Sequence, residues 1–244
     1  HNVLCLSEAK GMDINMKKVL NSEAVKIIAL VTMLIDHIGY IMYGHIDTSV
    51  YNVLRGIGRI SFPLFAFLIA EGFFYTKDEK KYLLRIMSFA FISEIPFNMM
   101  TGGRIIYTGS VNVLFTFTIA LLVLYVCRYY DKKGHGFGIL HFLTVVVGMA
   151  LAFLIRSDYS YCGVALVFVF YYMRYNKGAG YYLTAALIMT LYGESISSLA
   201  AVVSLVFIYL YNGEKGKYGN RIKWFFYVFY PVHMMILGII GRFL

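Results

Sequence analysis

The stretch Lys26–Gly44, KIIALVTMLIDHIGYIMYG, decides the fold because it is almost long enough and apolar enough to cross a bilayer on its own. A membrane-crossing helix needs about 20 predominantly apolar residues. The stretch nevertheless begins with Lys26 and carries Asp36 and His37 in its second half. Ionisable side chains are costly in lipid and usually functional, so the segment predicts a membrane helix with a chemical role.

The composition of the whole chain agrees with a membrane protein. Of its 244 residues 60% are hydrophobic and only 14% are charged, whereas a soluble domain carries about 25% charged residues. The formal net charge of +9 could indicate a nucleic-acid partner. The cations, however, gather in alternate loops, as described below, and we expect no nucleic-acid binding.

Eight more apolar runs follow the first. We predict an all-α, polytopic membrane bundle of about nine transmembrane helices, at residues 26–44, 55–75, 83–100, 112–128, 139–155, 159–175, 180–194, 197–211 and 224–243. The seventh and eighth runs are short, which leaves a re-entrant or tilted pair open. We assign residues 17–244 to one membrane domain and residues 1–16 to an N-terminal extension outside it.

The distribution of Lys and Arg predicts the orientation. Seventeen of the 22 cations lie before or at the start of the first span and around the loops that follow spans two, four, six and eight; the other five are Arg55, Arg59, Arg104, Arg156 and Arg242. Positively charged loops remain in the cytoplasm. The N-terminus is therefore expected in the cytoplasm, the C-terminus outside, and the protein in the cell membrane.

Lys26 and His37 are predicted to share one side of the first helix. Eleven residues bring a helix back to within about 20° of its starting direction, and His37 then lies roughly 16 Å beyond Lys26, near mid-membrane. An imidazole can take or give a proton near neutral pH, although a lone buried histidine can also simply bond to a neighbouring helix. Asp36 points about 100° away, so a carboxylate partner for the ring must come from another element.

Other spans also carry ionisable groups. Arg59 lies near the outer boundary, where it either binds an anionic or carbonyl group or extends to the headgroups. Pro63 leaves the carbonyl of Arg59 without its helical N–H partner and predicts a kink. Glu71 lies near the cytoplasmic end of the same span.

Two more ionisable groups are predicted at the depth of His37. Glu94 stands beside Pro96 in the third span, and His233 in the last span lies about 13 Å beyond Trp224. Asn112, at the outer start of the fourth span, adds a milder polar group. Two histidines and a glutamate could in principle bind a metal, but no His-x-x-x-His pair supports one, and we expect no metal.

In their order along the chain, these residues resemble the TraX family. The resemblance is carried by Lys26-x10-His37, Gly58-Arg59-x3-Pro63-Leu64-Phe65, Ser93-Glu94-Ile95-Pro96, Asn112-Val113 and Tyr230-Pro231-x-His233. The family is named for a conjugative-plasmid protein associated with N-acetylation of pilin. TraX proteins are in turn similar to the wider transmembrane acyltransferases, and Glu71 stands where those enzymes have a serine.

The resemblance implies transfer of an acetyl or other acyl group from cytoplasmic acetyl-coenzyme A to an amine or hydroxyl at or across the membrane. His37 would be the general base, Arg59 would stabilise negative charge, and Asp36 or Glu94 would orient a ring or relay protons. Lys26, Lys81 and Arg85 would hold the phosphates of coenzyme A. The expected acceptor-binding residues are Glu71, Asn112, Tyr230 and His233.

Two other classes remain open. Buried His, Glu and Arg also serve proton-coupled secondary transporters, although no internal repeat with paired broken helices supports that class. A non-enzymatic assembly factor is the third possibility. The acceptor could be a peptide, a glycan or a small molecule, and the three cysteines suggest no role.

Overall fold

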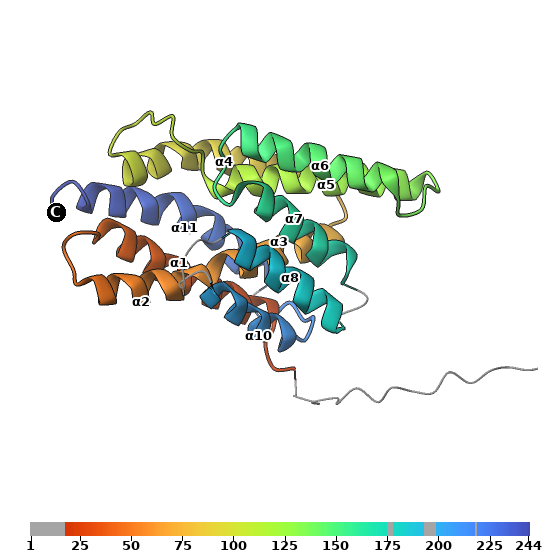
Figure 1. Cartoon of the computed structure of the whole chain (residues 1–244), viewed down its shortest axis with the longest axis horizontal. Coiled ribbons are helices and arrows are strands. Elements are labelled where there is room, and N and C mark those ends of the chain that lie inside the picture. The colour runs from red at the N-terminus through yellow and green to blue at the C-terminus, as the bar shows by residue number, and fades with distance from the viewer. Residues whose placement is uncertain (1–17, 175–177, 193–198, 218) are drawn as a thin grey trace, which may run out of the picture.

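The computed structural model describes residues 18–174, 178–192, 199–217 and 219–244. The extension at residues 1–16 lies outside the described residues. Within them the fold is all helical (Figure 1): α1 Ser22–Ile41, α2 Thr48–Arg59, α3 Ser61–Tyr75, α4 Glu79–Gly102, α5 Val113–Lys132, α6 Ile139–Leu154, α7 Ser160–Tyr172, α8 Ala179–Tyr192, η1 Ala200–Val203, α10 Ser204–Tyr209 and α11 Gly219–Ile240.

Polar caps mark where four of these helices begin. The side chains of Asn21, Asp47, Asp78 and Asn112 each accept a backbone N–H from the first turn of α1, α2, α4 and α5, at 2.8–3.0 Å. Such caps satisfy N–H groups that have no partner inside the helix. The helix boundaries are thus encoded by short polar residues between the apolar runs.

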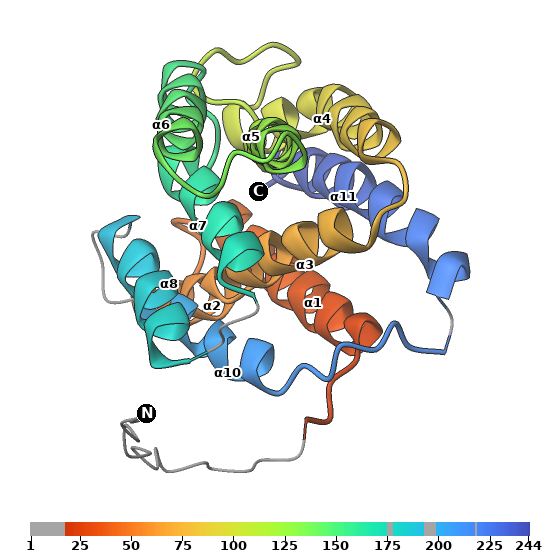
Figure 2. The same ribbon diagram turned by 90° about the vertical axis from the view of Figure 1, so that its right-hand side faces the viewer.

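Helix α3 lies at the centre of the bundle (Figure 2) and contacts α1, α2, α5, α7 and α10. Its side chains form much of the core, and Leu64, Ala66, Phe67 and Phe73 have no exposed surface. Helix α11 packs mainly against α4 and also against α1. Helices α3 and α11 therefore both contact α1.

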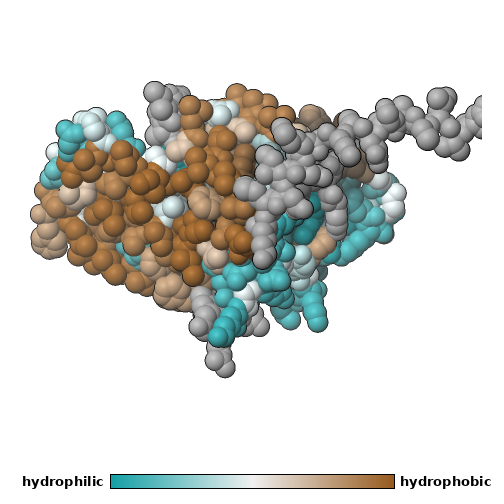
Figure 3. Space-filling view, turned by 90° about the horizontal axis from the view of Figure 1, so that it is seen from below, coloured by the Kyte–Doolittle hydropathy of each residue, from teal (hydrophilic) through white to brown (hydrophobic). Residues whose placement is uncertain are grey.

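The outer surface is apolar. Figure 3 shows a broad hydrophobic face with hydrophilic residues gathered towards its edges. Large aliphatic and aromatic side chains project from the peripheral helices, and Phe142, Leu154, Leu183 and Leu191 are 63–72% exposed. A patch of this extent is unfavourable in water and suits lipid. The protein is therefore a helical membrane protein.

Four helices of the described chain are long and apolar enough to cross a membrane, α2 and α3 counting as one: Ser22–Ile41, Thr48–Tyr75, Glu79–Gly102 and Val113–Lys132. Shorter apolar helices of 10–17 residues coincide with the five remaining predicted runs. Each predicted run therefore has helical structure. The number of spans and their orientation stay predictions.

The second predicted span differs from the structure. We expected it to begin at residue 55, but α2 begins at Thr48 and the helix is interrupted at Ile60. Pro63 has no N–H for the carbonyl of Arg59, and the N–H of Ile60 bonds instead to Ile57, three residues back, at 3.2 Å. The interruption follows from the proline, as predicted, and it places Arg59 at the end of α2.

Candidate functional site

A polar chamber of about 240 Å³ lies near the ends of α1 and α4. Its walls come from α1, α2, α3, α4, α5, α11 and the connections before α5 and α7. Its polar and charged lining residues are Asp36, His37, Tyr40, Arg55, Arg59, Ser61, Thr101, Tyr107, Ser110, Asp158, Tyr159 and Tyr230. The sequence thus brings the candidate base His37 into one cavity with Arg59, Asp36 and Tyr230.

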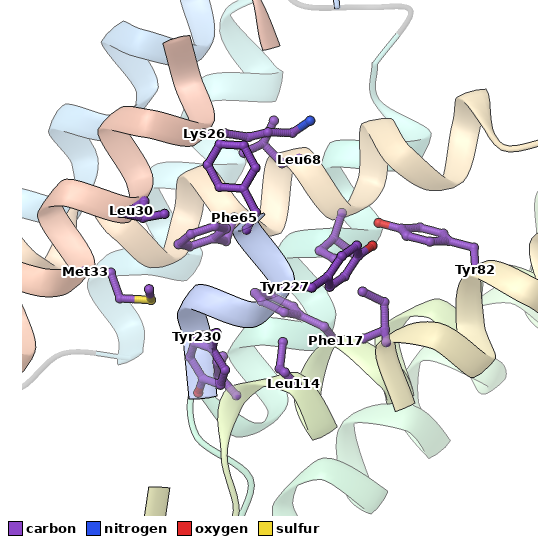
Figure 4. A pocket seen from close by; sticks show the side chains of 14 residues that line it. Lys26, Leu30, Met33, Phe65, Leu68, Tyr82, Leu114, Phe117, Tyr227 and Tyr230 are labelled. Atoms are coloured by element: carbon purple, nitrogen blue, oxygen red, sulfur yellow. The ribbon is translucent and has the colours of Figure 1, made fainter. Parts of the chain in front are cut away.

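A second, apolar cavity of about 160 Å³ occupies the opposite half of the bundle, around the starts of α1 and α4 (Figure 4). Lys26 lies at one end and Tyr230 at the other, and between them the walls are mainly aliphatic and aromatic. The only polar side chains in its lining, all within the described residues, are those of Lys26, Tyr82, Tyr227 and Tyr230. The apolar cavity therefore suits an extended, largely uncharged chain with a negative group near Lys26.

The two cavities adjoin one another. The same side chains line both cavities and form a layer that we call the partition: Met33, Phe65, Val113, Phe117 and Tyr230. The partition contains no charged group. His37 lies on the polar-chamber side of it.

His37 is bonded to the second predicted histidine. Its Nδ1 is 2.7 Å from Nε2 of His233, and Nδ1 of His233 is 2.7 Å from the backbone carbonyl of Phe229. The two rings are nearly parallel, with 5° between their planes. His233 is only 5% exposed and does not line the polar chamber. His233 is therefore a buried neighbour of the candidate base His37 and lies outside the lining of the polar chamber.

The carboxylate of Asp36, expected to orient a ring or relay protons, is bonded to an arginine instead. Asp36 forms an ion pair with Arg55 on α2, at 2.7 Å. The two helices approach closely because Gly58 faces Asp36: a Cβ at Gly58 would lie 2.2 Å from Cβ and Oδ1 of the aspartate. A small residue at a helix contact permits this approach.

Arg59 has a different environment from Arg55. Its Nη1 donates to the hydroxyl of Tyr159 at 3.4 Å, and among the described residues it has no carboxylate partner within ion-pair distance. The ring of Tyr159 stacks on Phe62 with 3.6 Å between ring centroids. The guanidinium carries five N–H donors, so most of them remain available to a group bound in the polar chamber.

The connection before α7 holds Asp158 and Tyr159 in place. It pairs with the connection before α5 through two backbone bonds between Val111 and residues Arg156 and Asp158, at 3.2 and 3.0 Å. Arg156, Tyr159 and Ser160 have φ values of 54°, 58° and 40°, a left-handed conformation that is unfavourable for residues other than glycine. Burial raises the pKa of Asp158 to about 6, against the opposing influence of nearby Arg59.

The three predicted phosphate-binding cations have different surroundings. Lys26 lines the apolar cavity, with its Nζ 5.8 Å from the centroid of Phe226. Arg85 donates from Nε to the hydroxyl of Tyr227, a lining residue, at 3.1 Å. Lys81 lines neither cavity; its side chain is 83% exposed and pairs with Asp78 at 3.2 Å. Lys26 and Arg85 are thus the better-placed pair.

Glu94 and Asn112 form a pair of their own. The Nδ2 of Asn112 donates to Glu94 at 2.6 Å and to the carbonyl of Ala90 at 2.8 Å, while its Oδ1 caps α5 through Leu114. Neither side chain lines the polar chamber or the apolar cavity. Glu94 is therefore bonded to Asn112 at the start of α5 and not to the imidazole of His37. This bond fixes the start of α5 against α4.

Glu71 also lies away from the cavities. It forms an ion pair with Arg174 at 2.9 Å, and the two side chains are 8% and 9% exposed. Arg174 in turn lies over the ring of Phe74, 3.3 Å from its centroid. A buried pair of this kind ties the end of α3 to the end of α7 and gives no sign of an acceptor-binding role.

No group of three His, Cys, Asp or Glu side chains that could hold a metal occurs in the described chain. The lining of the apolar cavity is chemically compatible with an acyl thioester of coenzyme A. Its apolar walls would contact the thioester and the alkyl parts of the arm, its tyrosine hydroxyls would bond the amides, and Lys26 and Arg85 would neutralise phosphate charge.

Sequence reasoning missed Arg55 and Asp158 as chamber residues. Arg55 and Arg59 are four residues apart, a spacing that puts both on one helix face. Asp158 reaches the polar chamber only through the tertiary pairing of the connections before α5 and α7, which local spacing does not predict.

One comparison with known proteins identifies a family. A family model described as "TraX protein" matches residues 21–241, which include every candidate site residue. Among curated proteins, the chain is similar to one described as "Probable fimbrial assembly protein FimC, serogroup H1" from Dichelobacter nodosus, with 29% identity over 238 residues, 87% of this chain and 92% of that protein. No solved structure matches the chain.

Proposed function

The chain belongs to the TraX family, and we propose that it is an acyltransferase of the bacterial cell membrane. It transfers an acetyl group from acetyl-coenzyme A to an amine or hydroxyl acceptor at or across the membrane. One observation carries the proposal: the imidazole of His37 and the guanidinium of Arg59 face one chamber, directly beside a cavity that has Lys26 at its far end.

The proposed donor site is the apolar cavity. Coenzyme A enters from the end of the bundle where α1 and α4 begin, with its phosphates near Lys26 and Arg85. Its arm extends between the aliphatic walls towards the partition. The thioester reaches His37 when side chains of the partition move aside.

The proposed acceptor site is the polar chamber. His37 removes the proton from the attacking amine or hydroxyl as the new C–N or C–O bond forms. Arg59 stabilises the negative charge that develops on the acyl oxygen. The C–S bond then breaks, and the protonated His37 returns the proton to the sulfur. The products are the acylated acceptor and free coenzyme A.

A second candidate is membrane assembly of fimbriae without catalysis, and it is favoured by the similarity to a protein described as a probable fimbrial assembly protein. The two roles differ in their need for the donor. An acyltransferase is stabilised against heat by coenzyme A because the ligand binds the folded state, by about 2.7 kcal/mol at a ligand concentration of 100 Kd. An assembly factor or a transporter of other solutes gains nothing from it.

The direct test uses the purified protein in lipid nanodiscs with radiolabelled acetyl-coenzyme A and a cell-envelope extract. We expect label to appear in the extract, and His37→Ala to lower the rate at least about a hundredfold, as removal of a general base does. The matched control is His45→Ala, since His45 is an exposed histidine between α1 and α2 and its loss should leave the rate unchanged. Full-rate transfer by His37→Ala would refute the assigned base.

A further inference from the structure

The position of His233 behind His37 has a consequence for the protonation of both rings. We infer that His233 is a positioning residue, which together with the carbonyl of Phe229 fixes His37 in the tautomer that presents a basic Nε2 to the polar chamber. The inference rests on the proposed function for its catalytic meaning. The tautomer itself follows from hydrogen bonding.

The backbone carbonyl of Phe229 determines which nitrogen of His233 carries a proton. A backbone carbonyl can only accept, so the Nδ1 of His233, 2.7 Å away, must carry the proton. A neutral imidazole has one N–H, and the deep burial of His233 favours the neutral form. Its Nε2 is therefore a lone-pair acceptor.

The protonation of His233 in turn determines that of His37. Its Nδ1 lies 2.7 Å from the acceptor Nε2 of His233, so Nδ1 of His37 carries the proton and donates it. The 5° between the ring planes is the arrangement expected when an in-plane N–H donates to an in-plane lone pair. The remaining nitrogen of His37, Nε2, then has the free lone pair. Among the described residues no protein group bonds it and it is not sealed from the cavity.

The second histidine is itself held rigidly. The ring of Phe229 stacks on His233 with 4.8 Å between centroids and 15° between planes. The ring and the backbone carbonyl of Phe229 together hold His233 in place.

Within the part of the chain that the structure describes, no carboxylate bonds either ring. The charged neighbours are committed to other groups, Asp36 to Arg55 and Glu94 to Asn112. In hydrolases that use a serine nucleophile, a buried aspartate keeps the catalytic histidine in the right tautomer. Here the same task falls to a neutral histidine. When His37 takes a proton from the acceptor, its Nδ1–H becomes a charge-assisted donor to His233, which stabilises the cation.

The test is side-chain ¹⁵N NMR of the full chain, labelled in histidine and reconstituted in nanodiscs, because protonated and unprotonated ring nitrogens have distinct shifts. His37→Gln assigns the signals. We expect the wild-type His37 to show a protonated Nδ1 and an unprotonated Nε2. In His233→Leu the acceptor is gone, and His37 should change to a mixture that includes protonated Nε2.

A kinetic arm separates positioning from folding. His233→Leu should lower kcat for coenzyme A release in the envelope assay by about 10²- to 10⁴-fold, with KM for acetyl-coenzyme A unchanged. His233→Gln keeps an acceptor oxygen and should restore part of the loss. His135→Leu, at an exposed histidine between α5 and α6, should change neither the ring-nitrogen signals of His37 nor the rate of coenzyme A release.

Two results would overturn the inference: a wild-type His37 protonated at Nε2, or a His37 spectrum that is the same in His233→Leu. If the leucine variant does not fold, the wild-type spectrum alone decides. If the tautomer is as expected but no acetyl transfer occurs at all, the proposed function fails and the hydrogen-bonded pair stands.

Discussion

At the scale of single residues, the two arginines of α2 show how partners define roles. Arg55 is neutralised by Asp36 at 2.7 Å, whereas the only hydrogen bond of Arg59 to a described residue goes to the neutral hydroxyl of Tyr159. The first pair joins α1 to α2, and the second arginine is left with free donors in the polar chamber. Asp158 also lines the polar chamber near Arg59, yet burial raises the pKa of its carboxyl and makes it harder to ionise than usual.

We predict that Asp158→Asn stabilises the protein at alkaline but not at acid pH. The folded-state pKa of about 6 exceeds the ordinary value of about 3.9, so the fold favours the protonated carboxyl. That contribution is fully present below about pH 4 and is lost as the pH rises through 6. Since one pKa unit corresponds to about 1.4 kcal/mol, the increase in unfolding free energy of Asp158→Asn at pH 8 should not exceed about 3 kcal/mol.

Thermal unfolding in nanodiscs at pH 4 and pH 8 measures this difference. The matched control is Asp47→Asn, because the backbone N–H of Ser49 lowers the pKa of that exposed carboxyl. Its substitution should have the opposite sign or no effect at pH 8. A Tm of Asp158→Asn that exceeds the wild-type value equally at both pH values would contradict the prediction.

At the scale of helices, the sequence was informative where apolar runs were long. Lys26 and His37 were predicted to share one side of α1, and each lines one of two adjoining cavities. The beginning of α2 was missed because Thr48, Ser49 and Asn52 interrupt the apolar pattern outside the expected span. The placement of Arg55 against Asp36 and of Asp158 in the polar chamber depends on tertiary packing, which local spacing does not encode.

The contact between α1 and α2 gives a prediction of its own. Gly58→Ala would place a methyl group 2.2 Å from Cβ and Oδ1 of Asp36, so the helices must separate and weaken the Asp36–Arg55 pair. We expect a loss of about 1–3 kcal/mol in unfolding free energy, typical of overpacking. Gly56→Ala, two residues away on the same helix, meets only the Cβ of Ala200 at 4.0 Å.

The glycine pair is compared by denaturation of the two purified variants in detergent. Gly56→Ala should be neutral or slightly stabilising, since alanine favours a helix over glycine by about 1 kcal/mol. Equal stability of the two variants would show that the close approach to Asp36 is unimportant.

At the scale of the whole molecule, the two cavities occupy opposite halves of the bundle. The apolar cavity begins beside the starts of α1 and α4, and the polar chamber lies beside their ends. With the N-terminus in the cytoplasm, as the distribution of Lys and Arg predicts, donor and acceptor would reach His37 from different sides of the membrane.

Substituted cysteines test this arrangement. In a variant without native cysteines, we expect Lys26→Cys to react with a membrane-impermeant thiol reagent only in inverted vesicles, and Ser110→Cys, in the polar chamber, only in right-side-out spheroplasts. Met33→Cys, in the partition, should react more slowly than either. Labelling of Lys26→Cys and Ser110→Cys from the same side would contradict the proposed orientation.

The partition also bears on the energy supply of the cell. Two water-accessible cavities that met freely inside a spanning bundle would let protons and ions leak, and the electrochemical gradient across the membrane would dissipate. In the proposed orientation, the five side chains of the partition, none of them charged, would act as a mainly hydrophobic constriction of the kind that excludes ions by remaining dry. A cell could therefore keep many copies of the protein in its membrane without losing the voltage that drives its other transport.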